Sequence, residues 1–333
     1  MKAVVYTKYG SPDVLQLKEV DRPIPKNDEV LIKVYAAEAT KTDCELRSFN
    51  FQVKWFWLPL RIAMGLMKPK KQILGGYFAG EVESVGKDVS KFKKGDQVFG
   101  TTKLRLGAYG EYVCLPASYT LVPKPCNLSF EEAAGVPLGG LNALHFLRKA
   151  NIQKGEKVLV IGAGGSIGTF GVQIAKAMGA EVTAVDSTIK EEMLGRIGAD
   201  HFFDYTKEDF TKSGQTYDVI FSMVANSSYS ECLKALKPKG RFLMANPRIS
   251  DMLRSVLTSK FTDKTAIFVF AGEKEEELLA LKEMIEEGKI KSVVDKIYSF
   301  EKAAEAHRRV ETEKRLGTVV ISMEHNKKTN SFQ

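Results

Sequence analysis

A glycine-rich turn between an apolar run and an amphipathic run constrains this chain more than any other feature. In KVLVIGAGGSIGTFGVQIAKAMG, a strand is predicted at 157–161 and a helix begins directly after the turn. Gly162 permits the tight turn, and Gly168 permits close packing of the helix on the strand. Unpaired N–H groups and the dipole at a helix start attract phosphates. The pattern therefore predicts a dinucleotide site built from Gly162, Gly164, Gly165, Ser166 and Ile167.

The end of the next predicted strand, EVTAVDS, carries conflicting signals about which dinucleotide binds. Asp186 ends this strand where an acid accepts hydrogen bonds from the ribose hydroxyls and repels a 2′-phosphate, which favours NAD. Ser187 and Lys190 follow in the next turn, where they are well placed to hold a 2′-phosphate, which favours NADP. The residues alone leave both cofactors open.

From about residue 125, apolar runs of four to six residues alternate with amphipathic segments, as in KVLVIG, EVTAVD, DVIFSM and RFLMAN. Such runs are typical of parallel strands that are buried on both faces of a sheet. A helix is predicted ahead of them, with Ser129 as its N-cap and Glu132 completing a capping box. We therefore predict a doubly wound α/β domain over residues 125–272.

The first part of the chain alternates short β-rich runs with turns, as in KAVVYTKYG, EVLIKVYAAEAT, GEVESVG and GAYGEYVCLP. This alternation is typical of a barrel-like all-β domain, which we place at residues 1–124. After residue 273 the strand–helix alternation stops. Residues 273–333 are therefore predicted to return to the first domain and complete it.

One segment between the early strands, FNFQVKWFWLPLRIAMGLMKPKKQ, contains both tryptophans and ends in basic residues. A helix packed on the core, a mobile flap over an apolar pocket and a contact with a membrane surface all account for this composition. The sequence alone does not choose among the three.

The composition limits the classes of protein to which the chain can belong. Its 333 residues are 44% hydrophobic and 27% charged, as in a globular protein with two domains. No apolar run approaches the roughly 20 residues that span a bilayer, and MKAVVYTKYG lacks the apolar core of a signal peptide. We therefore expect a cytoplasmic protein without stable membrane insertion.

The net charge and the cysteines limit the ligands and the kinds of cross-link that we expect. The net charge of +8 is spread among acids except in MKPKKQ, so we attribute it to solubility and to a phosphate-bearing cofactor rather than to nucleic acid. The four cysteines form no CxxC pair, which excludes a disulfide framework and a structural zinc site.

Taken together, the motifs resemble the medium-chain dehydrogenase/reductase superfamily, and in particular its zinc-independent quinone oxidoreductase branch. The resemblance rests on GEVESVG, GDQVFG, GAYGEYV, FEEAAGVPLGGLNAL, the glycine loop and KPKGRF, which span nearly the whole chain. It implies a GroES-like β-barrel catalytic domain that the C-terminal tail completes, with a Rossmann domain inserted between. It also implies a cofactor in the cleft between the domains, and a homodimer.

The resemblance further implies that catalytic zinc is absent. In the zinc-dependent branch a ligand cysteine stands two residues before a Thr-Asp pair, and here that position is Thr40. The same branch has a Gly-His-Glu-x-x-Gly motif, and here GGYFAG places Gly76 at the histidine and Tyr77 at the acid. None of these three residues supplies the Cys, His or carboxylate through which zinc binds.

In the members that use NADPH, the 2′-phosphate is held by a lysine after the second strand, a tyrosine in a (D/N)Y motif and a basic residue near the final strand. Lys190 and Tyr205 match the first two positions, and Lys314 or Arg315 loosely matches the third. We take Arg315 as the candidate. The resemblance therefore favours NADP(H), while Asp186 departs from the pattern and keeps NAD(H) possible.

Without a metal to polarise an alcohol oxygen, the hydride acceptor must already be electrophilic, as a quinone or an α,β-unsaturated carbonyl (enone) is. The protein must stack this acceptor on the nicotinamide, exclude water and donate a hydrogen bond to its carbonyl oxygen. Tyr77 and Thr40 are the candidate donors, while Asp43 and Arg47 are expected to form an internal ion pair. The candidate walls of an apolar substrate pocket are Trp55, Trp57 and Tyr77.

The sequence therefore predicts a zinc-independent oxidoreductase that transfers a hydride from a reduced nicotinamide cofactor to a quinone or an enone. Two other functions stay open. One is the NAD-dependent oxidation of an alcohol without zinc. The other is a low-turnover dinucleotide-binding sensor or adaptor, which acts at a membrane surface through the tryptophan-rich segment.

Overall fold

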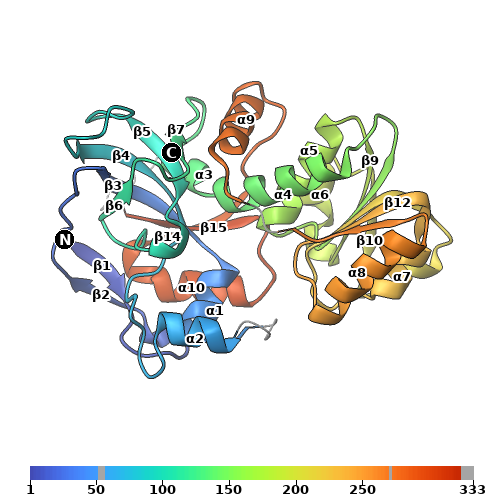
Figure 1. Cartoon of the computed structure of the whole chain (residues 1–333), viewed down its shortest axis with the longest axis horizontal. Coiled ribbons are helices and arrows are strands. Elements are labelled where there is room, and N and C mark those ends of the chain that lie inside the picture. Colours follow the sequence, from blue (N-terminus) through green and yellow to red (C-terminus); the bar gives the residue numbers. More distant parts are fainter. Residues whose placement is uncertain (52–56, 270–271, 324–333) are drawn as a thin grey trace, which may run out of the picture. The chain divides into compact units, whose positions relative to one another are not determined.

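A computed structural model describes residues 1–51, 57–269 and 272–323 of the chain (Figure 1). The chain divides into two compact units. Unit 1 comprises Met1–Asn50, Pro59–Pro137 and Val294–Gln333, and unit 2 comprises Phe51–Leu58 and Leu138–Val293.

These boundaries differ from the expected ones near residues 125 and 273 for two physical reasons. Helix α3 (Phe130–Ala134) stays with unit 1 because Phe130 stacks on Tyr35 with ring centroids 4.5 Å apart. Helix α9 (Glu275–Glu286) belongs to unit 2, where Glu277 bonds His145 at 2.9 Å.

Unit 1 is built on a mostly antiparallel sheet whose described strands follow the order β14-β15-β3-β4-β5-β7, with β6 also paired to β3. Strands β14 and β15 pair in parallel, and the other described neighbours pair antiparallel. The central strand β3 is almost entirely buried, which its run EVLIKVYAAEA explains because both faces of the strand are covered. A separate two-stranded sheet joins β1 to β2. The strands span Lys2–Val5 (β1), Gln16–Glu19 (β2), Glu29–Ala39 (β3), Tyr77–Val85 (β4), Gln97–Thr101 (β5), Tyr112–Pro116 (β6), Leu121–Pro123 (β7), Val294–Ser299 (β14) and Thr318–Ser322 (β15).

The C-terminal part of the chain contributes to unit 1. Strand β15 pairs antiparallel with β3, from Val319 opposite Ala39 to Ser322 opposite Ala36. Helix α10 packs on β15 and on α1. The remaining helical segments of the unit are η1 (Pro12–Val14), α1 (Lys41–Ser48), α2 (Trp57–Met64, which begins in unit 2), η2 (Lys103–Arg105), η5 (Phe300–Lys302) and α10 (Ala303–Glu311).

Unit 2 is a parallel sheet whose strands follow the order β10-β9-β8-β11-β12-β13 in the described chain. Every neighbouring pair in it is parallel. The first three strands run outward from the centre to one edge and the next three to the other, which is the doubly wound Rossmann order. The strands span Lys157–Ile161 (β8), Glu181–Asp186 (β9), His201–Asp204 (β10), Tyr217–Ser222 (β11), Leu236–Met244 (β12) and Thr265–Ile267 (β13).

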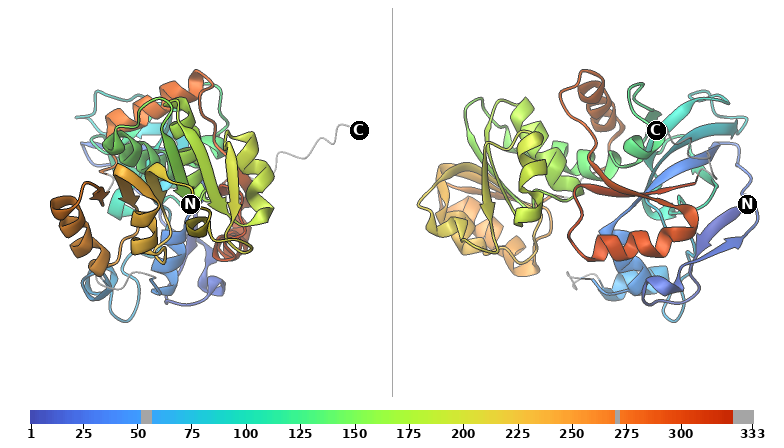
Figure 2. Two further views of the ribbon diagram at one scale, coloured as in Figure 1. Left: turned by 90° about the vertical axis from the view of Figure 1, so that its right-hand side faces the viewer. Right: turned by 180° about the vertical axis from the view of Figure 1, so that it is seen from behind.

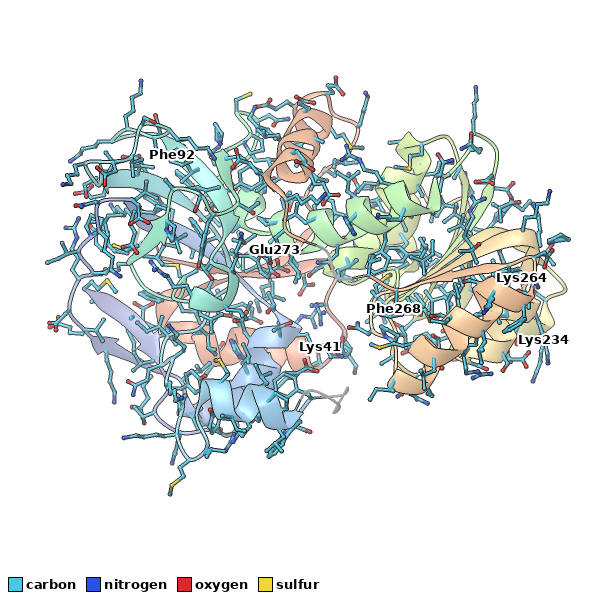
Figure 3. The ribbon with its side chains drawn as sticks, in the orientation of Figure 1. Lys41, Phe92, Lys234, Lys264, Phe268 and Glu273 are labelled. Atoms are coloured by element: carbon cyan, nitrogen blue, oxygen red, sulfur yellow. The ribbon has the colours of Figure 1, made fainter. Side chains whose placement is uncertain are left out.

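Helices cover both faces of this sheet (Figure 2). The helices α5 and α6 lie against β8, β9 and β10, whereas α7 and α8 lie against β12 and β13. Phe268, which directly follows β13 and is labelled in Figure 3, packs against a buried cluster to which all six strands of the sheet contribute. The helical segments span Pro137–Ala150 (α4), Ser166–Ala177 (α5), Thr188–Lys190 (η3), Glu191–Arg196 (α6), Phe210–Lys212 (η4), Tyr229–Lys234 (α7) and Ile249–Phe261 (α8).

The fold confirms the predicted class, which is a GroES-like β domain with a doubly wound Rossmann domain. The predicted capping box is also present, since Ser129 accepts from the Glu132 N–H at 3.1 Å and Glu132 accepts from the Ser129 N–H at 2.8 Å. Within the described ranges, the helices are all too short or too polar to cross a membrane.

Candidate functional site

The glycine loop of unit 2 connects β8 to α5 through a left-handed turn. Gly162 has a φ of +81°, and its N–H donates to the carbonyl of Val185 at 3.0 Å. Gly165 is the N-cap of α5, and its lack of a side chain leaves the helix start without a capping group of its own. The first turn of a helix carries N–H groups that no residue of the helix accepts from, so this end suits a phosphate.

Gly168 shows why the loop needs glycine inside the helix as well. A Cβ built on Gly168 would lie 2.3 Å from the carbonyl oxygen of Gly162 and 2.6 Å from Ala163. The helix therefore approaches the loop more closely than any side chain permits. The predicted loop residues Gly162, Gly164, Gly165, Ser166 and Ile167 thus lie together at the carboxyl end of β8, and this geometry fits a dinucleotide.

The two residues that gave opposite signals about the cofactor form an ion pair. Asp186 and Lys190 are both buried, and Lys190 Nζ lies 3.0 Å from Asp186 Oδ1. The carboxylate also accepts from the Ser187 N–H at 2.8 Å and, through Oδ2, from the Gly164 N–H at 2.8 Å. A Cβ on Gly164 would lie 2.2 Å from Lys190 Cδ, so the lysine stem crosses the glycine loop.

Tyr205 lies beside this pair. Its N–H donates to the carbonyl of Asp186 at 3.2 Å, and its side chain is 64% exposed. The preceding Asp204 accepts from the hydroxyls of Thr188 and Thr206, and these bonds lower the pKa of its carboxyl. Asp204 therefore ties the turn that carries Lys190 to the turn that carries Tyr205.

The other predicted cofactor and pocket residues lie elsewhere. Arg315 belongs to unit 1, where its guanidinium donates to the Val310 carbonyl at 3.0 Å and to Glu313 at 3.1 Å. Its contact with the cofactor stays a prediction. Trp57 starts α2 and is exposed, while Trp55 lies outside the described residues.

Thr40 and Asp43 form a buried capping box at the start of α1. Thr40 accepts from the Asp43 N–H at 3.0 Å, and its hydroxyl donates to Asp43 Oδ2 at 2.6 Å. Asp43 Oδ1 accepts from the Gly75 N–H at 3.0 Å, and burial raises the pKa of the carboxyl. The expected Asp43–Arg47 ion pair is wrong, because Arg47 pairs with Glu311 while Asp43 serves the cap of α1 and the GGYFAG segment.

The segment GGYFAG follows directly from this anchor. Gly75 has a φ of +96°, and a Cβ on it would lie 2.7 Å from the ring of Tyr109. A Cβ on Gly76, in contrast, would meet no described atom within 4 Å. Tyr77 then starts β4 and is half-buried. The segment therefore has no room for a side chain at Gly75 but has room for one at Gly76. Gly76 is the position at which the zinc-dependent branch has its ligand histidine.

A further polar network in unit 1 was not predicted. Tyr109 OH lies 3.1 Å from His307 Nε2, and the other ring nitrogen, Nδ1, lies 3.4 Å from Cys44 Sγ. Burial, together with the charge of Arg47, lowers the pKa of His307 to about 3, so the ring is neutral. Tyr109 and His307 are 198 residues apart, so no local motif joins them. Their contact depends on the packing of α10, which carries His307, against the rest of unit 1.

Within residues 1–51, 57–269 and 272–323, no three His, Cys, Asp or Glu side chains are grouped so that they could hold a metal ion.

The fold and the glycine loop define the class, and comparison with known proteins defines the family. Residues 26–126 match the alcohol dehydrogenase GroES-like domain, and residues 197–321 match the zinc-binding dehydrogenase domain. The chain belongs to the medium-chain dehydrogenase/reductase superfamily, in its quinone oxidoreductase-like branch, and is an NAD(P)H-dependent oxidoreductase.

Several relatives are similar along nearly the whole chain. The 2-methylene-furan-3-one reductase of Solanum lycopersicum is 34% identical, over 96% of this chain and 79% of its own length. The quinone oxidoreductase of Homo sapiens is 31% identical, over 93% of this chain and 94% of its own. The chloroplastic NADPH-dependent alkenal/one oxidoreductase of Arabidopsis thaliana is 31% identical, over 96% of this chain and 79% of its own.

Solved structures agree with this assignment. The quinone oxidoreductase of Coxiella burnetii superposes with a TM-score of 0.86 at 28% identity, over 97% of this chain and 99% of its own.

Proposed function

We propose that this protein transfers a hydride from a reduced nicotinamide dinucleotide to a quinone or to the β-carbon of an α,β-unsaturated carbonyl. The observation that carries the proposal is the glycine loop at the carboxyl end of β8, in a chain whose relatives are named as quinone and enone reductases. The bound cofactor would supply the hydride, and the protein would supply the binding, orientation and hydrogen bonds.

We propose Tyr77 as the donor of a hydrogen bond to the substrate carbonyl oxygen, where negative charge develops. Thr40 suits this role less well because its hydroxyl hydrogen is directed to Asp43. Tyr77→Phe is expected to lower kcat by about tenfold with little change in cofactor affinity, because losing one hydrogen bond in the transition state costs about 1.4 kcal/mol. Equal kcat in the variant and the parent protein would show that Tyr77 does not donate this hydrogen bond.

The activity is tested by the loss of nicotinamide absorbance with a panel of quinones and enones. Turnover with these acceptors, and none with simple alcohols and NAD, would support the proposal over the alcohol dehydrogenase alternative. No oxidation of either NADPH or NADH by any acceptor would leave the low-turnover sensor as the better reading.

We propose NADP(H) as the preferred cofactor and assign Asp186 a positioning role. The support is the buried ion pair, in which Asp186 holds Lys190 over the glycine loop, with Tyr205 exposed beside it. A 2′-phosphate would replace Asp186 as the partner of the lysine ammonium. Because Asp186 offsets part of the lysine charge, we expect the preference over NAD(H) to be modest.

The cofactor proposal is tested by titrating both reduced cofactors into variants. Lys190→Ala should weaken NADPH binding about tenfold, which is about 1.4 kcal/mol, and leave NADH nearly unchanged. Lys212→Ala, which removes an exposed lysine of the same unit, is the matched control. Unchanged NADPH affinity in Lys190→Ala would contradict the phosphate assignment.

We also propose that catalysis needs no zinc. The support is the residue chemistry at Thr40, Gly76 and Tyr77, none of which offers a zinc ligand. Metal analysis of the purified, active protein should find no stoichiometric zinc, and chelator treatment should leave the rate unchanged. One zinc per active chain would overturn this part of the proposal.

We propose that the protein forms a homodimer through α8. This helix carries large apolar side chains that are at least half exposed and lie beside β13 at the edge of the sheet. The side chains are Ile249, Leu253, Val256, Leu257 and Phe261. Sedimentation should give a dimer for the parent chain and a monomer for Leu253→Lys, whereas a monomeric parent would contradict it. The cytoplasmic location stays a prediction.

A further inference from the structure

Helix α2 and the loop after it lie at the edge of unit 1 (Figure 1). Ile62, Leu66 and Met67 are 55%, 61% and 93% exposed, and Leu58, one turn before Ile62 on the same helix face, is exposed too. Three exposed lysines, Lys68, Lys70 and Lys71, follow at once. We call Ile62, Leu66, Met67, Lys68, Lys70 and Lys71 the α2 patch.

The helix is held with its charged side chain inward. The guanidinium of Arg61 lies over the ring of Tyr9 at 3.8 Å and over the ring of Phe49 at 4.4 Å. Met64 on the same side is buried. The hydroxyl of Tyr9 donates to the carbonyls of Met64 and Gly65, at 3.2 Å and 2.8 Å. The apolar residues therefore face outward as a consequence of packing.

The loop after α2 is also fixed. Gly65 has a φ of +117°, and a Cβ on it would lie 2.1 Å from the Lys68 carbonyl oxygen. The Lys70 N–H donates to the Met64 carbonyl at 2.8 Å, and Lys70 Nζ donates to the Ile62 carbonyl at 3.3 Å. These contacts place the lysines next to the exposed apolar side chains.

The charge of the patch identifies the kind of surface that would cover it. Residues 49–72 contain no acidic residue, so the rim that this segment contributes to the patch is cationic. Large apolar side chains beside a lysine cluster match a bilayer, where acyl chains lie under anionic headgroups. A second copy is a poor occupant, because a two-fold contact would bring two cationic rims together.

We propose that the α2 patch docks this protein reversibly on an anionic phospholipid bilayer. Ile62, Leu66 and Met67 would enter the headgroup and acyl boundary, and Lys68, Lys70 and Lys71 would lie at the anionic headgroups. The proposal concerns a surface outside the glycine loop and does not depend on the reaction. Docking would bring the enzyme to apolar acceptors dissolved in the bilayer.

Co-sedimentation with vesicles tests the proposal on the full chain. The parent protein should sediment with phosphatidylserine-containing vesicles, remain free with phosphatidylcholine alone, and dissociate at high salt. Lys68→Gln/Lys70→Gln/Lys71→Gln should bind about a hundredfold more weakly, since each lysine near such a surface contributes about 1 kcal/mol. Ile62→Ser/Leu66→Ser should lose at least about tenfold.

Two matched controls separate the patch from general charge and general apolarity. Lys212→Gln/Lys234→Gln/Lys239→Gln changes the net charge equally at exposed lysines of unit 2. Ile24→Ser removes an exposed apolar side chain of unit 1 that lies outside both the α2 patch and α8. Both controls should bind vesicles as the parent does, and thermal unfolding should show that every variant is folded.

Three results would overturn the proposal. The first is no binding of the parent to anionic vesicles, and the second is equal loss in the lysine controls and the patch variants. The third is unchanged vesicle binding in the Ile62→Ser/Leu66→Ser variant together with a raised KM for water-soluble quinones, which would make the patch a substrate wall. Because vesicle binding is measured without substrate, failure here leaves the proposed reaction untouched.

Discussion

The glycine loop of unit 2 and the polar network of unit 1 are built in opposite ways. The loop is made of backbone, and its parts lie between residues 157 and 190. The network is made of side chains that the chain supplies from residue 40 to residue 311. A backbone site depends on which positions lack a Cβ, whereas a side-chain network depends on tertiary pairing. Substitutions in the glycine loop should therefore lower cofactor affinity, whereas substitutions in the polar network should lower the stability of unit 1.

The largest effect is expected for Asp43→Ala. The change removes the acceptor for the Gly75 N–H and the Thr40 hydroxyl in a buried site. We expect a loss of about 4 kcal/mol in the free energy of unfolding of unit 1, because each unsatisfied buried donor costs about 1–3 kcal/mol. Urea unfolding of the variant measures it.

NADPH titration of the folded Asp43→Ala protein sharpens the comparison. We expect cofactor affinity to stay within about twofold, because Asp43 bonds Thr40 and Gly75 within unit 1, whereas the glycine loop belongs to unit 2. Asp43→Asn keeps one acceptor oxygen and should recover part of the stability. A tenfold loss of NADPH affinity in the folded variant would show that the two regions are coupled.

Gly168→Ala should have the reverse pattern. The added Cβ would overlap the Gly162 carbonyl oxygen, so the loop must move, at a cost of about 1–3 kcal/mol of overpacking. We expect NADPH affinity to fall by at least about tenfold, as measured by fluorescence titration.

The matched control for this change lies in the same unit. Gly195 is inside α6, and a Cβ there would meet nothing within 4 Å. Gly195→Ala should therefore keep cofactor affinity and gain a few tenths of a kcal/mol in stability. If both alanine variants bind NADPH like the parent, close packing at Gly168 does not define the site.

The pH dependence of stability reports on His307. Its pKa in the folded protein is about 3, below its ordinary value, because burial and the charge of Arg47 oppose the protonated ring. The unfolded chain therefore binds a proton below pH 6.5 that the folded chain does not. This contribution to stability is complete above pH 6.5 and is lost as the pH falls toward 3.

Between pH 7 and pH 5 we expect the parent to lose about 2 kcal/mol more stability than His307→Gln, by urea unfolding. The raised pKa of Asp43 acts in the opposite direction, but it is common to both proteins and cancels in the difference. Identical acid sensitivity in the two proteins would mean that the pKa of His307 in the folded protein is not lowered.

The smallest effect is expected at the surface. Lys41, which is labelled in Figure 3, forms an ion pair in which its Nζ lies 2.6 Å from Glu313 Oε1. Both side chains are substantially exposed. Lys41→Ala should change the stability by less than about 0.5 kcal/mol, since solvent and salt screen such pairs. A loss above about 1 kcal/mol in the free energy of unfolding, measured in urea, would show that this ion pair is coupled to the buried polar network.

Much of the fold could be predicted because the spacing of apolar residues and the local capping residues indicate where strands and helices lie. The apolar runs gave the strands of unit 2, and the Ser129 capping box gave the start of α3. The predicted single helix after it is two helices, because Pro137 cannot donate an N–H within a helix and instead begins α4. Helix α8 was not predicted, since its exposed apolar residues obscure its amphipathic period.

The parts of the site that depend on backbone conformation could be predicted from the sequence. The ion pairs and hydrogen bonds between side chains could not. The glycine pattern placed the turn at Gly162, which has the expected positive φ. Asp186 and Lys190, in contrast, were weighed as rivals although four residues and a turn make them partners. Arg47 pairs with Glu311 and not with Asp43, although Asp43 is nearer in the sequence. The packing of α10 on α1 brings Glu311 to Arg47.

The pairing of β15 with β3 has a consequence for how the protein is made. Strand β3 leaves the ribosome before residues 138–293, whereas its partner at residues 318–322 is synthesised after them. All of residues 138–293 emerge before that partner, so unit 2 is complete in the nascent chain while unit 1 still has an open sheet edge. Nascent-chain chaperones should therefore engage the older, N-terminal part of the polypeptide longer than the younger middle.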